Sequence, residues 1–505
     1  MKKQSISRQK ANQKLTIGIY VILFFILVII WMKKMIQFNS VVSDVYYLLS
    51  SGRYIVTTRS IPHINPFIQD GNRQIVIQNW LSCVIDYLIY NKHGERGLYY
   101  FGVIISVLIA ILLFFLIRQY TKNNRMGIFL YLLSILPLVY AMNIRAASVT
   151  CCILFIEQII LKKVHDGKNK ALLILFPVLS LFLVNFHAAY WLFLFVMALP
   201  FLIICYPVYT WKEITTFYKE KIPLILSLAV SFLVGFINPY GTKSMFYLIY
   251  SYGSASQGGL IAELNHTQMY GAPFVLSMLI LVTATLVIRN YGMKKNEYMI
   301  WFACGIIFLV SLSVKNTWFL PFGMIPVCSY YVNEKQVVDL SGLKINDFFW
   351  RIFVLLLLIF SIWTVQSNYS DYLSGDSSLV PVEAEKYLSK YDKDEVKLFS
   401  HHIINNYFEW MGYKVYMDSR PEIYNEKLSG KEDLYTTEVA VQNGKIDYQE
   451  FLEQNEFTHV ITTPNVEKEG TAILDAYMTN NPDYKLVVEG NNYKLYEKVD
   501  FDGTK

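Results

Sequence analysis

Charged residues are scarce in this chain of 505 residues: Asp, Glu, Lys and Arg make up 17% of it, against 54% hydrophobic residues. This composition excludes an ordinary soluble enzyme. Cysteine is also rare, and the six cysteines lie in or beside apolar segments, so they do not indicate a disulfide framework. The sequence has no internal repeat, no Gly-rich nucleotide loop and no metal-ligand cluster of specific spacing.

Long apolar runs dominate the first three quarters of the chain. Nearly uncharged runs of this kind, about 17 to 22 residues long, match the length needed to cross roughly 30 Å of hydrocarbon. The first run lacks the small-residue cleavage site of a signal peptide, so we expect a retained anchor. The sequence thus predicts a polytopic α-helical membrane protein with about eleven spans, at 16–36, 97–118, 126–142, 146–162, 170–187, 188–208, 222–238, 273–289, 297–314, 316–332 and 350–367.

The Lys/Arg distribution predicts the orientation of these spans. Positive residues in short loops stay cytoplasmic, and the basic N-terminus (1–15) falls on the same side as the loops "RQYTKNNR" and "KKVHDGKNK". The net charge of +6 therefore reflects membrane topology rather than nucleic-acid binding. We expect a multi-pass protein of the cell membrane whose transmembrane domain (16–367) has long outer loops at 37–96 and 238–272.

The tail, 368–505, is expected outside the cell because the number of spans is odd. Its helical patterns, such as "TAILDAYMTN", alternate with strand-like runs: "VKLFS", "KVYMD", "THVITT", "YKLVVEG" and "NYKLYEKV". This alternation predicts a small soluble α/β domain. His401 and His402 with Glu409 are conceivable metal ligands, but we interpret them as a surface cluster and predict no metal site.

Polar side chains gather on the predicted outer face. Asp44 follows the first span closely, in "SDVYYLLSSGRYIVTTRSIPHINPF". Ionisable groups near membrane depth are costly and mark candidate sites, and the outer ends of several helices can share one cavity. The further candidates on this face are Arg53, Arg59, Gln78, Arg145, His187, Asn238, Glu263 and Lys315.

Simpler roles compete with a site for each of these residues. Asp44 could cap the helix that follows it, and Glu263 could be a solvated loop carboxylate. His187 is favoured as an interfacial histidine with its hydrogen bonds satisfied. Asn238, beside a proline and a glycine, is favoured as a turn residue.

Basic side chains on the outer face could bind either of two kinds of phosphate. Arg59, Arg145 and Lys315 could bind lipid headgroup phosphates or a particular phosphate in the site. In "MDSRPEIY" of the tail, Asp418 and Arg420 either pair with each other, the favoured interpretation, or bind an acceptor.

The ordered set "GRYIVTTRSIPHINPF", "QNWLSCVIDYLIY", "NFHAAYW", "INPYG" and "IAELNH" resembles the bacterial multispan proteins with a GT-C glycosyltransferase-type membrane fold. In the tail, "NNYFEWMGYKVYMDSRPEIY" resembles the outer-domain segment of one uncharacterised branch of that group. The resemblance implies that Asp44 is a catalytic base or a metal-binding acid. Many relatives have two adjacent acids where this chain has Ser43 and Asp44, which weakens the metal role. Other departures are Gln78 and Asn79 in place of an acid, and Lys315 and Asn316 in place of an arginine-rich pattern.

The leading hypothesis is a glycosyltransferase that uses a polyprenyl-phosphate-linked sugar. An acceptor hydroxyl needs a carboxylate such as Asp44 to take its proton, and the departing phosphate needs cations. The expected partners are the lipid-linked sugar, a cell-envelope glycan or lipid acceptor, and the bilayer; no cofactor is indicated, and a divalent metal is left open. A transporter or flippase of lipid-linked glycans and a noncatalytic membrane-anchored assembly protein are the alternatives.

Overall fold

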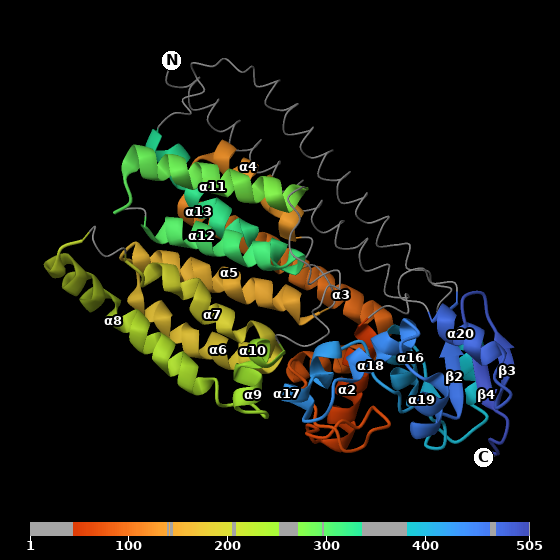
Figure 1. The fold of residues 1–505 in the computed structure, drawn as a ribbon. Coiled ribbons are helices and arrows are strands. Elements are labelled where there is room, and N and C mark those ends of the chain that lie inside the picture. Colours follow the sequence, from red (N-terminus) through yellow and green to blue (C-terminus); the bar gives the residue numbers. More distant parts are fainter. Residues whose placement is uncertain are drawn as a thin grey trace. The chain divides into compact units, whose positions relative to one another are not determined.

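A computed structural model describes residues 44–138, 141, 145–204, 209–251, 271–294, 297–335, 381–464 and 471–503 (Figure 1). The chain divides into two compact units. Among the described residues, unit 1 comprises 99–237 and 271–335, and unit 2 comprises 44–98, 238–251 and 381–503. The expected spans at 16–36 and 350–367 lie outside the described residues.

Unit 1 is helical. It contains the second part of α3, a helix (Trp80–Tyr120) that is broken at Gly94, where φ is 61°. The longer helices that follow are α4 (Asn124–Leu138), α5 (Ala146–His165), α6 (Leu175–Phe186), α7 (Trp191–Ala198), α8 (Trp211–Val234), α11 (Ala272–Tyr291), α12 (Glu297–Leu312) and α13 (Leu320–Lys335). Short 3-10 turns connect some of them: η3 (Lys170–Ile174), η4 (Ala188–Tyr190), η5 (Leu199–Phe201) and η8 (Val314–Phe319).

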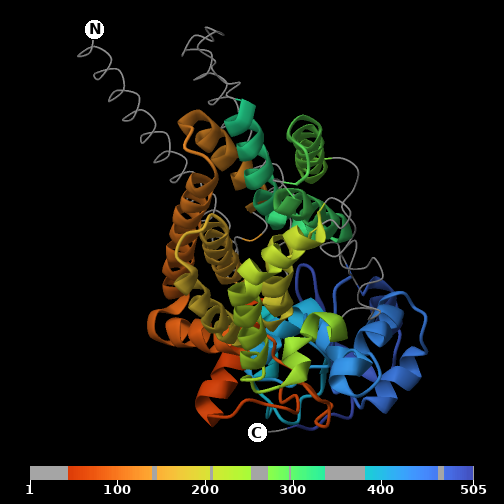
Figure 2. The same cartoon turned by 90° about the vertical axis from the view of Figure 1, so that its left-hand side faces the viewer.

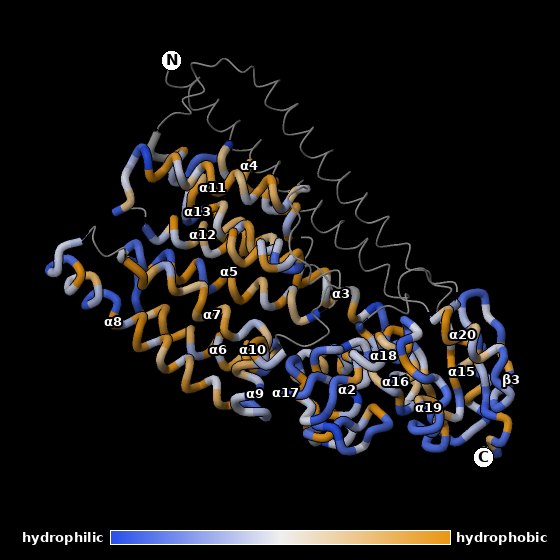
Figure 3. The backbone as a smooth tube through the Cα atoms, in the orientation of Figure 1, coloured by the Kyte–Doolittle hydropathy of each residue, from blue (hydrophilic) through white to orange (hydrophobic). Residues whose placement is uncertain are grey.

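Apolar residues line the helices of unit 1 (Figure 3). Two described helices are long and apolar enough to cross a membrane, Tyr100–Tyr120 and Ala272–Tyr291. Four shorter apolar stretches coincide with other expected spans: Asn124–Leu138, Lys170–Phe186, Ala188–Phe201 and Glu297–Leu312. The count of eleven spans therefore stays a prediction.

Close helix packing holds unit 1 together. Helices α6 and α8 lie side by side, as Figures 1 and 2 show. Between α6 and α7, Trp191 Nε1 donates a hydrogen bond to Ser180 Oγ at 2.8 Å, and Ser180 Oγ donates to the carbonyl of Ser231 on α8 at 2.7 Å. This buried relay satisfies polar groups that apolar surroundings would otherwise penalise.

Unit 2 combines three segments that are distant in sequence. The first contributes α2 (Val45–Thr58), an irregular loop and the start of α3, and the second contributes α9 (Thr242–Met245) and α10 (Tyr247–Ser251). The third contributes α15 (Val382–Leu388), α16 (His402–Met411), η10 (Pro421–Tyr424), α17 (Glu426–Ser429), α18 (Leu434–Gln442), α19 (Tyr448–Gln454) and α20 (Ala472–Thr479) together with four strands.

Specific hydrogen bonds join these segments. Tyr240 Oη donates to the carbonyl of Pro62 at 3.0 Å. Lys243 Nζ donates to Gln74 Oε1 at 2.8 Å and to the carbonyl of Leu428 at 3.3 Å. The two loops predicted to lie outside the membrane thus form one compact unit with residues of the tail.

The four strands form one sheet in the order β1-β2-β4-β3. Strand β1 (Leu398–Phe399) pairs in parallel with β2 (His459–Thr462), whereas β4 (Lys494–Lys498) is antiparallel to both β2 and β3 (Tyr484–Glu489). These strands confirm four of the five strand-like runs, and the alternation with helices confirms the α/β character of the tail. That the tail is a soluble domain by itself stays a prediction.

The fifth run, "KVYMD", is not a strand, and that prediction was wrong. Within this run, Val415 alone forms isolated β-bridges, one with Ile68 and one with Leu398. Side chains take the next backbone groups instead: Asn405 Nδ2 donates to the carbonyl of Met417 at 2.7 Å, and the amide of Asp418 donates to Tyr424 Oη at 3.1 Å. The segment therefore leaves the sheet just before Asp418 and turns toward α2.

Candidate functional site

Asp44 lies at the start of α2, where the sequence placed it. It occupies the N-cap position, but its side chain makes no capping hydrogen bond. Its Oδ1 instead accepts a hydrogen bond from Ser419 Oγ at 3.0 Å. A simple helix cap thus does not account for this half-buried carboxylate.

Ser419 is itself fixed by Asn406 of α16. The amide of Ser419 donates to Asn406 Oδ1 at 3.1 Å, and Asn406 Nδ2 donates to Ser419 Oγ at 2.7 Å. The serine hydroxyl thus accepts from Asn406 and donates its own proton to Asp44. The two asparagine contacts therefore orient the hydroxyl that holds the carboxylate.

Beside this chain of hydrogen bonds lies a buried ion pair. Arg420 Nε donates to Asp418 Oδ1 at 3.0 Å, and the Arg420 Nη2 group contacts the other oxygen of the same carboxylate. The guanidinium also donates to Ser51 Oγ at 3.3 Å and lies 4.6 Å from the ring centroid of Tyr47. Asp418 and Arg420 thus pair with each other, as the favoured interpretation of "MDSRPEIY" predicts.

A second acid, Glu409, faces the same guanidinium. Its Oε2 lies 4.0 Å from Arg420 Nη2, and the side chain is buried. Burial, followed by the nearby Asp418 carboxylate, raises the pKa of Glu409 well above its ordinary value. Glu409 therefore keeps its proton to a higher pH than an exposed glutamate does.

Arg53 and Arg59 have different surroundings. Arg53 Nη2 donates to the carbonyl of Trp410 at 2.7 Å, and its guanidinium lies 4.3 Å from the centroid of that ring. Arg59 ends α2 with a φ of 55° and an exposed side chain. A packing role accounts for the Arg53 contacts, whereas Arg59 faces solvent; the phosphate-binding role of both stays a prediction.

Three further candidates from the sequence are Asn238, Gln78 and Glu263. Asn238 has the turn role that was favoured for it: its Oδ1 accepts from the amide of Tyr240 at 2.9 Å, and its Nδ2 donates to the carbonyl of Gly241 at 3.1 Å. Gln78 is partly buried just before α3. Glu263 lies outside the described residues.

Unit 1 carries Arg145, His187 and Lys315. Arg145 directly precedes α5, whose Thr150 hydroxyl contacts His187 Nδ1 at 2.8 Å, so the histidine is satisfied as predicted. Tyr190, next to His187, packs on Trp318 of η8 at 5.7 Å between ring centroids, and η8 also contains Lys315. The segments that carry Arg145, His187 and Lys315 thus contact one another in unit 1. A site that these residues share with Asp44 stays a prediction.

The surface cluster expected at His401 and His402 is not on the surface, and that interpretation was wrong. His401 is 4% exposed, and the proposed third member, Glu409, is 2% exposed. The carboxylate beside the two histidines is instead Glu438, whose Oε1 lies 3.0 Å from His402 Nδ1. The sequence does not indicate this pairing, because Glu438 belongs to another helix.

Sequence reasoning also missed Ser419, Asn406 and Asp86 as polar members of unit 2. Burial raises the pKa of Asp86 to about 7, opposed by a hydrogen bond from Ser82 Oγ at 3.2 Å. The signal for Asn406 was present as two adjacent asparagines in the apolar pattern "HIINNYFEWM". Ser419 offered no signal of its own beyond its place between Asp418 and Arg420.

Comparison with solved structures identifies the type of fold. The chain is similar to the archaeal oligosaccharyltransferase AglB from Archaeoglobus fulgidus in complex with an inhibitory peptide and a dolichol-phosphate, with a TM-score of 0.53, 12% identity, and coverage of 90% of this chain and 70% of that chain. Crystal structures of an oligosaccharyltransferase from the same organism, tethered with an acceptor peptide and in the apo form, give TM-scores of 0.46 and 0.45 at 12% and 11% identity; they cover 89% and 88% of this chain and 69% of each of those chains.

No protein-family model matches the sequence, and no curated protein matches it. The similarity to AglB is therefore one of fold, and AglB is a membrane glycosyltransferase with the GT-C fold. Together with the two long apolar helices, it indicates a membrane protein with a GT-C-type fold.

Proposed function

We propose that this chain is a membrane glycosyltransferase that moves a sugar from a polyprenyl-phosphate-linked donor to a cell-envelope glycan or lipid on the outer face. One observation carries the proposal: within a fold similar to that of AglB, Asp44 is a half-buried carboxylate oriented by Ser419. The AglB structure holds a dolichol-phosphate and a peptide, which supports a lipid-linked donor and a separate acceptor. The N-terminus is then cytoplasmic and residues 368–505 extracytoplasmic.

Asp44 acts as the general base in this proposal. An acceptor hydroxyl attacks the anomeric carbon, the bond from that carbon to the phosphate oxygen breaks, and the hydroxyl proton moves to the carboxylate. The electron pair of the broken bond leaves with the lipid phosphate. A carboxylate has about four acceptor positions, so the hydrogen bond from Ser419 orients Asp44 without using up its capacity to accept a proton.

Cations balance the charge of the leaving phosphate. Arg59, Arg145 and Lys315 are the candidates proposed from the sequence for this role, since bidentate or point contacts to phosphate oxygens stabilise the developing charge. Arg53, Gln78, His187, Asn238 and Glu263 are proposed as further substrate-binding residues. Asp418 and Arg420 form a buried ion pair on either side of Ser419, and acceptor binding by them is the weaker alternative.

The test is a transfer assay in membranes with a panel of polyprenyl-phosphate sugars. We expect Asp44→Asn to lower the transfer rate about 10²- to 10⁴-fold, the usual contribution of a general base. The matched control is Asp394→Asn, because the Asp394 side chain is 82% exposed. Transfer by Asp44→Asn at the parental rate would exclude the proposed role of Asp44.

One observation favours transport of a lipid-linked glycan instead. Glu157 lies within α5 and is fully buried, and neither carboxylate oxygen has a hydrogen-bond partner within the described part of the chain. Such a group inside an apolar helix is a candidate for an ion or substrate pathway. Movement of a labelled lipid-linked sugar across proteoliposome membranes without any covalent product, and its loss in Glu157→Gln, would favour this function.

A further inference from the structure

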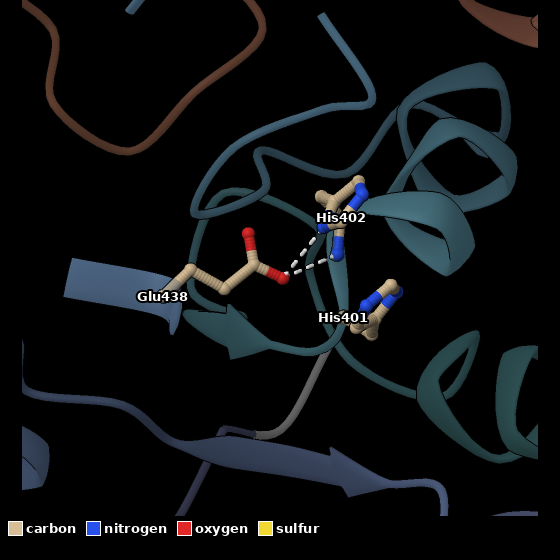
Figure 4. A group of neighbouring side chains, drawn as sticks. All are labelled: His401, His402 and Glu438. Carbon is tan, nitrogen blue, oxygen red and sulfur yellow. Dashed lines mark hydrogen bonds and ion pairs between the residues drawn. The ribbon is translucent and has the colours of Figure 1, made fainter. Parts of the chain in front are cut away.

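Two histidines and one glutamate meet in unit 2, at the start of α16. His401 caps the helix, His402 is its first residue, and Glu438 comes from α18. Their donor atoms all lie within 4.8 Å of one another. Figure 4 shows the Glu438 carboxylate facing the two imidazoles.

The hydrogen bonds in this cluster use only part of its donors and acceptors. Glu438 Oε1 accepts from the amide of His402 at 2.8 Å and contacts His402 Nδ1 at 3.0 Å. Glu438 Oε2 and His401 Nε2 have no hydrogen-bond partner among the residues that the structure describes, although both side chains are at least 96% buried. A buried polar atom left unpaired costs about 1–3 kcal/mol, so each of these two atoms calls for an explanation.

The three side chains suit a divalent transition metal. Imidazole nitrogen and carboxylate oxygen are ligands of Zn²⁺, which binds them at about 2.0–2.2 Å. In tetrahedral geometry two ligands of one such ion are therefore roughly 3.3–3.6 Å apart, and donors within 4.8 Å reach this spacing through side-chain movements. Three protein ligands leave a fourth position for water.

We propose that His401, His402 and Glu438 bind one divalent transition-metal ion of the Zn²⁺ type. The ion would join α16 to α18. Helix α16 also carries Asn406, which orients Ser419 beside Asp44, so the metal would stabilise the support of the candidate base without touching substrate. The inference does not depend on the proposed function, because its evidence is the cluster alone.

The metal site is tested on the full chain, purified in detergent through an affinity tag that contains no histidine. After treatment with EDTA and removal of the chelator, the protein is titrated with Zn²⁺ while bound metal is measured by mass spectrometry and the Tm is followed. We expect one Zn²⁺ per chain and a higher Tm. Co²⁺ is expected to give the visible absorption bands of a nitrogen- and oxygen-ligated ion.

Three variants separate the site from adventitious binding. His401→Gln and Glu438→Gln are expected to weaken Zn²⁺ binding at least 10-fold and to abolish the Tm increase. His93→Ala removes an exposed histidine of the same unit and should bind as the parent does. Should Glu438→Gln fail to fold, His401→Gln decides, because the hydrogen bond that this ring accepts within the described part of the chain is a long one, 3.3 Å from the amide of Ile403.

The opposite results are equally specific. If the parent protein binds no more Zn²⁺ than His401→Gln, or if all variants bind equally, the cluster is an ion pair between His402 and Glu438 and the inference is wrong. Loss of Zn²⁺ binding with full transfer activity would leave the proposed function intact. If Asp44→Asn loses transfer but binds Zn²⁺ normally, the result supports the role of Asp44 as the base and leaves the metal site unaffected.

Discussion

Ser419 donates a hydrogen bond to Asp44 across 375 positions of the sequence, at 3.0 Å between Oγ and Oδ1. The serine belongs to the tail and the acid to the first loop, and both lie in the same compact unit. The candidate base is therefore part of a polar chain, from Asn406 through Ser419 to Asp44, rather than a lone loop carboxylate.

Removal of this hydroxyl should impair the chemical step. A hydrogen bond to a charged group contributes about 1.5–3 kcal/mol, so Ser419→Ala is expected to lower kcat roughly 10- to 100-fold with a smaller change in KM. The measurement is sugar transfer at several donor concentrations. Ser419→Thr, which keeps a hydroxyl, should restore part of the rate.

The control for this variant is Ser389→Ala, since the hydroxyl of Ser389 is in unit 2 too but donates to the carbonyl of Lys386 and lies at an exposed position. Its transfer rate should equal that of the parent. A Ser419→Ala enzyme with unchanged kcat would show that the hydrogen bond does not orient a catalytic group.

Variants of Arg420 and Arg59 should distinguish an arginine with a structural role from one that binds a ligand. Arg420→Ala leaves the buried Asp418 carboxylate unpaired, which typically costs about 3–5 kcal/mol, so we expect a large fall in Tm. Arg59→Asn keeps a residue type that tolerates a positive φ and removes an exposed charge. This second variant should keep the parental Tm and raise the KM for the lipid-linked donor.

The two variants also check each other. Thermal unfolding in detergent measures the first effect, and transfer kinetics measure the second. A stable Arg420→Ala protein with weak acceptor binding would favour the acceptor role of Asp418 and Arg420 over the ion pair. An Arg59→Asn protein with parental KM would remove Arg59 from the phosphate site.

Local patterns predicted much of the tail. Strand β2 and helix α20 fall within the runs "THVITT" and "TAILDAYMTN", because alternation and helical spacing are properties of neighbouring residues. The run "KVYMD" has the same local pattern, but its backbone bonds to side chains instead of a strand: the Met417 carbonyl accepts from Asn405, and the Asp418 amide donates to the Tyr424 hydroxyl. Such competition depends on tertiary contacts and cannot be read from the run itself.

One expected span shows a similar limit of local patterns. Hydropathy averaged over 188–208 indicates one crossing, whereas the structure divides its described part into η4, α7 and η5. The average does not register a change of backbone geometry. Asp44 could be singled out from its place after an apolar run, but its partner Ser419 could not, since nothing local links residues so far apart.

Glu409 should make stability depend on pH. Its pKa is raised in the folded protein above the ordinary 4.5, so the folded state keeps a proton that the unfolded state releases. The resulting stabilisation is complete below about pH 4.5 and is lost as pH rises toward the folded pKa, at up to about 1.4 kcal/mol per pH unit. Glu409→Gln, which cannot lose a proton, should therefore gain Tm relative to the parent between pH 5 and 8.

The comparison uses Glu453→Gln as its control, because Glu453 is an exposed carboxyl on α19. Its Tm difference from the parent should stay constant over the same pH range. A constant difference for Glu409→Gln as well would mean that the folded protein does not retain the proton at this position.

Gly52 lies where α2 packs closely on the start of α3, about two helical turns after Asp44. A Cβ at this position would lie 2.0 Å from the carbonyl oxygen of Cys83 and 2.6 Å from Tyr87 Cβ, and the first of these atoms is backbone that cannot move alone. Gly52→Ala is therefore expected to push the helices apart, lower the Tm and reduce transfer together, with a cost of about 1–3 kcal/mol typical of overpacking. Gly71→Ala, where no atom lies within 4 Å of the new Cβ, should leave both unchanged. If Gly52→Ala unfolds at the parental temperature, α2 is not held against α3 at this position, and the placement of Asp44 beside Ser419 loses its support from that contact.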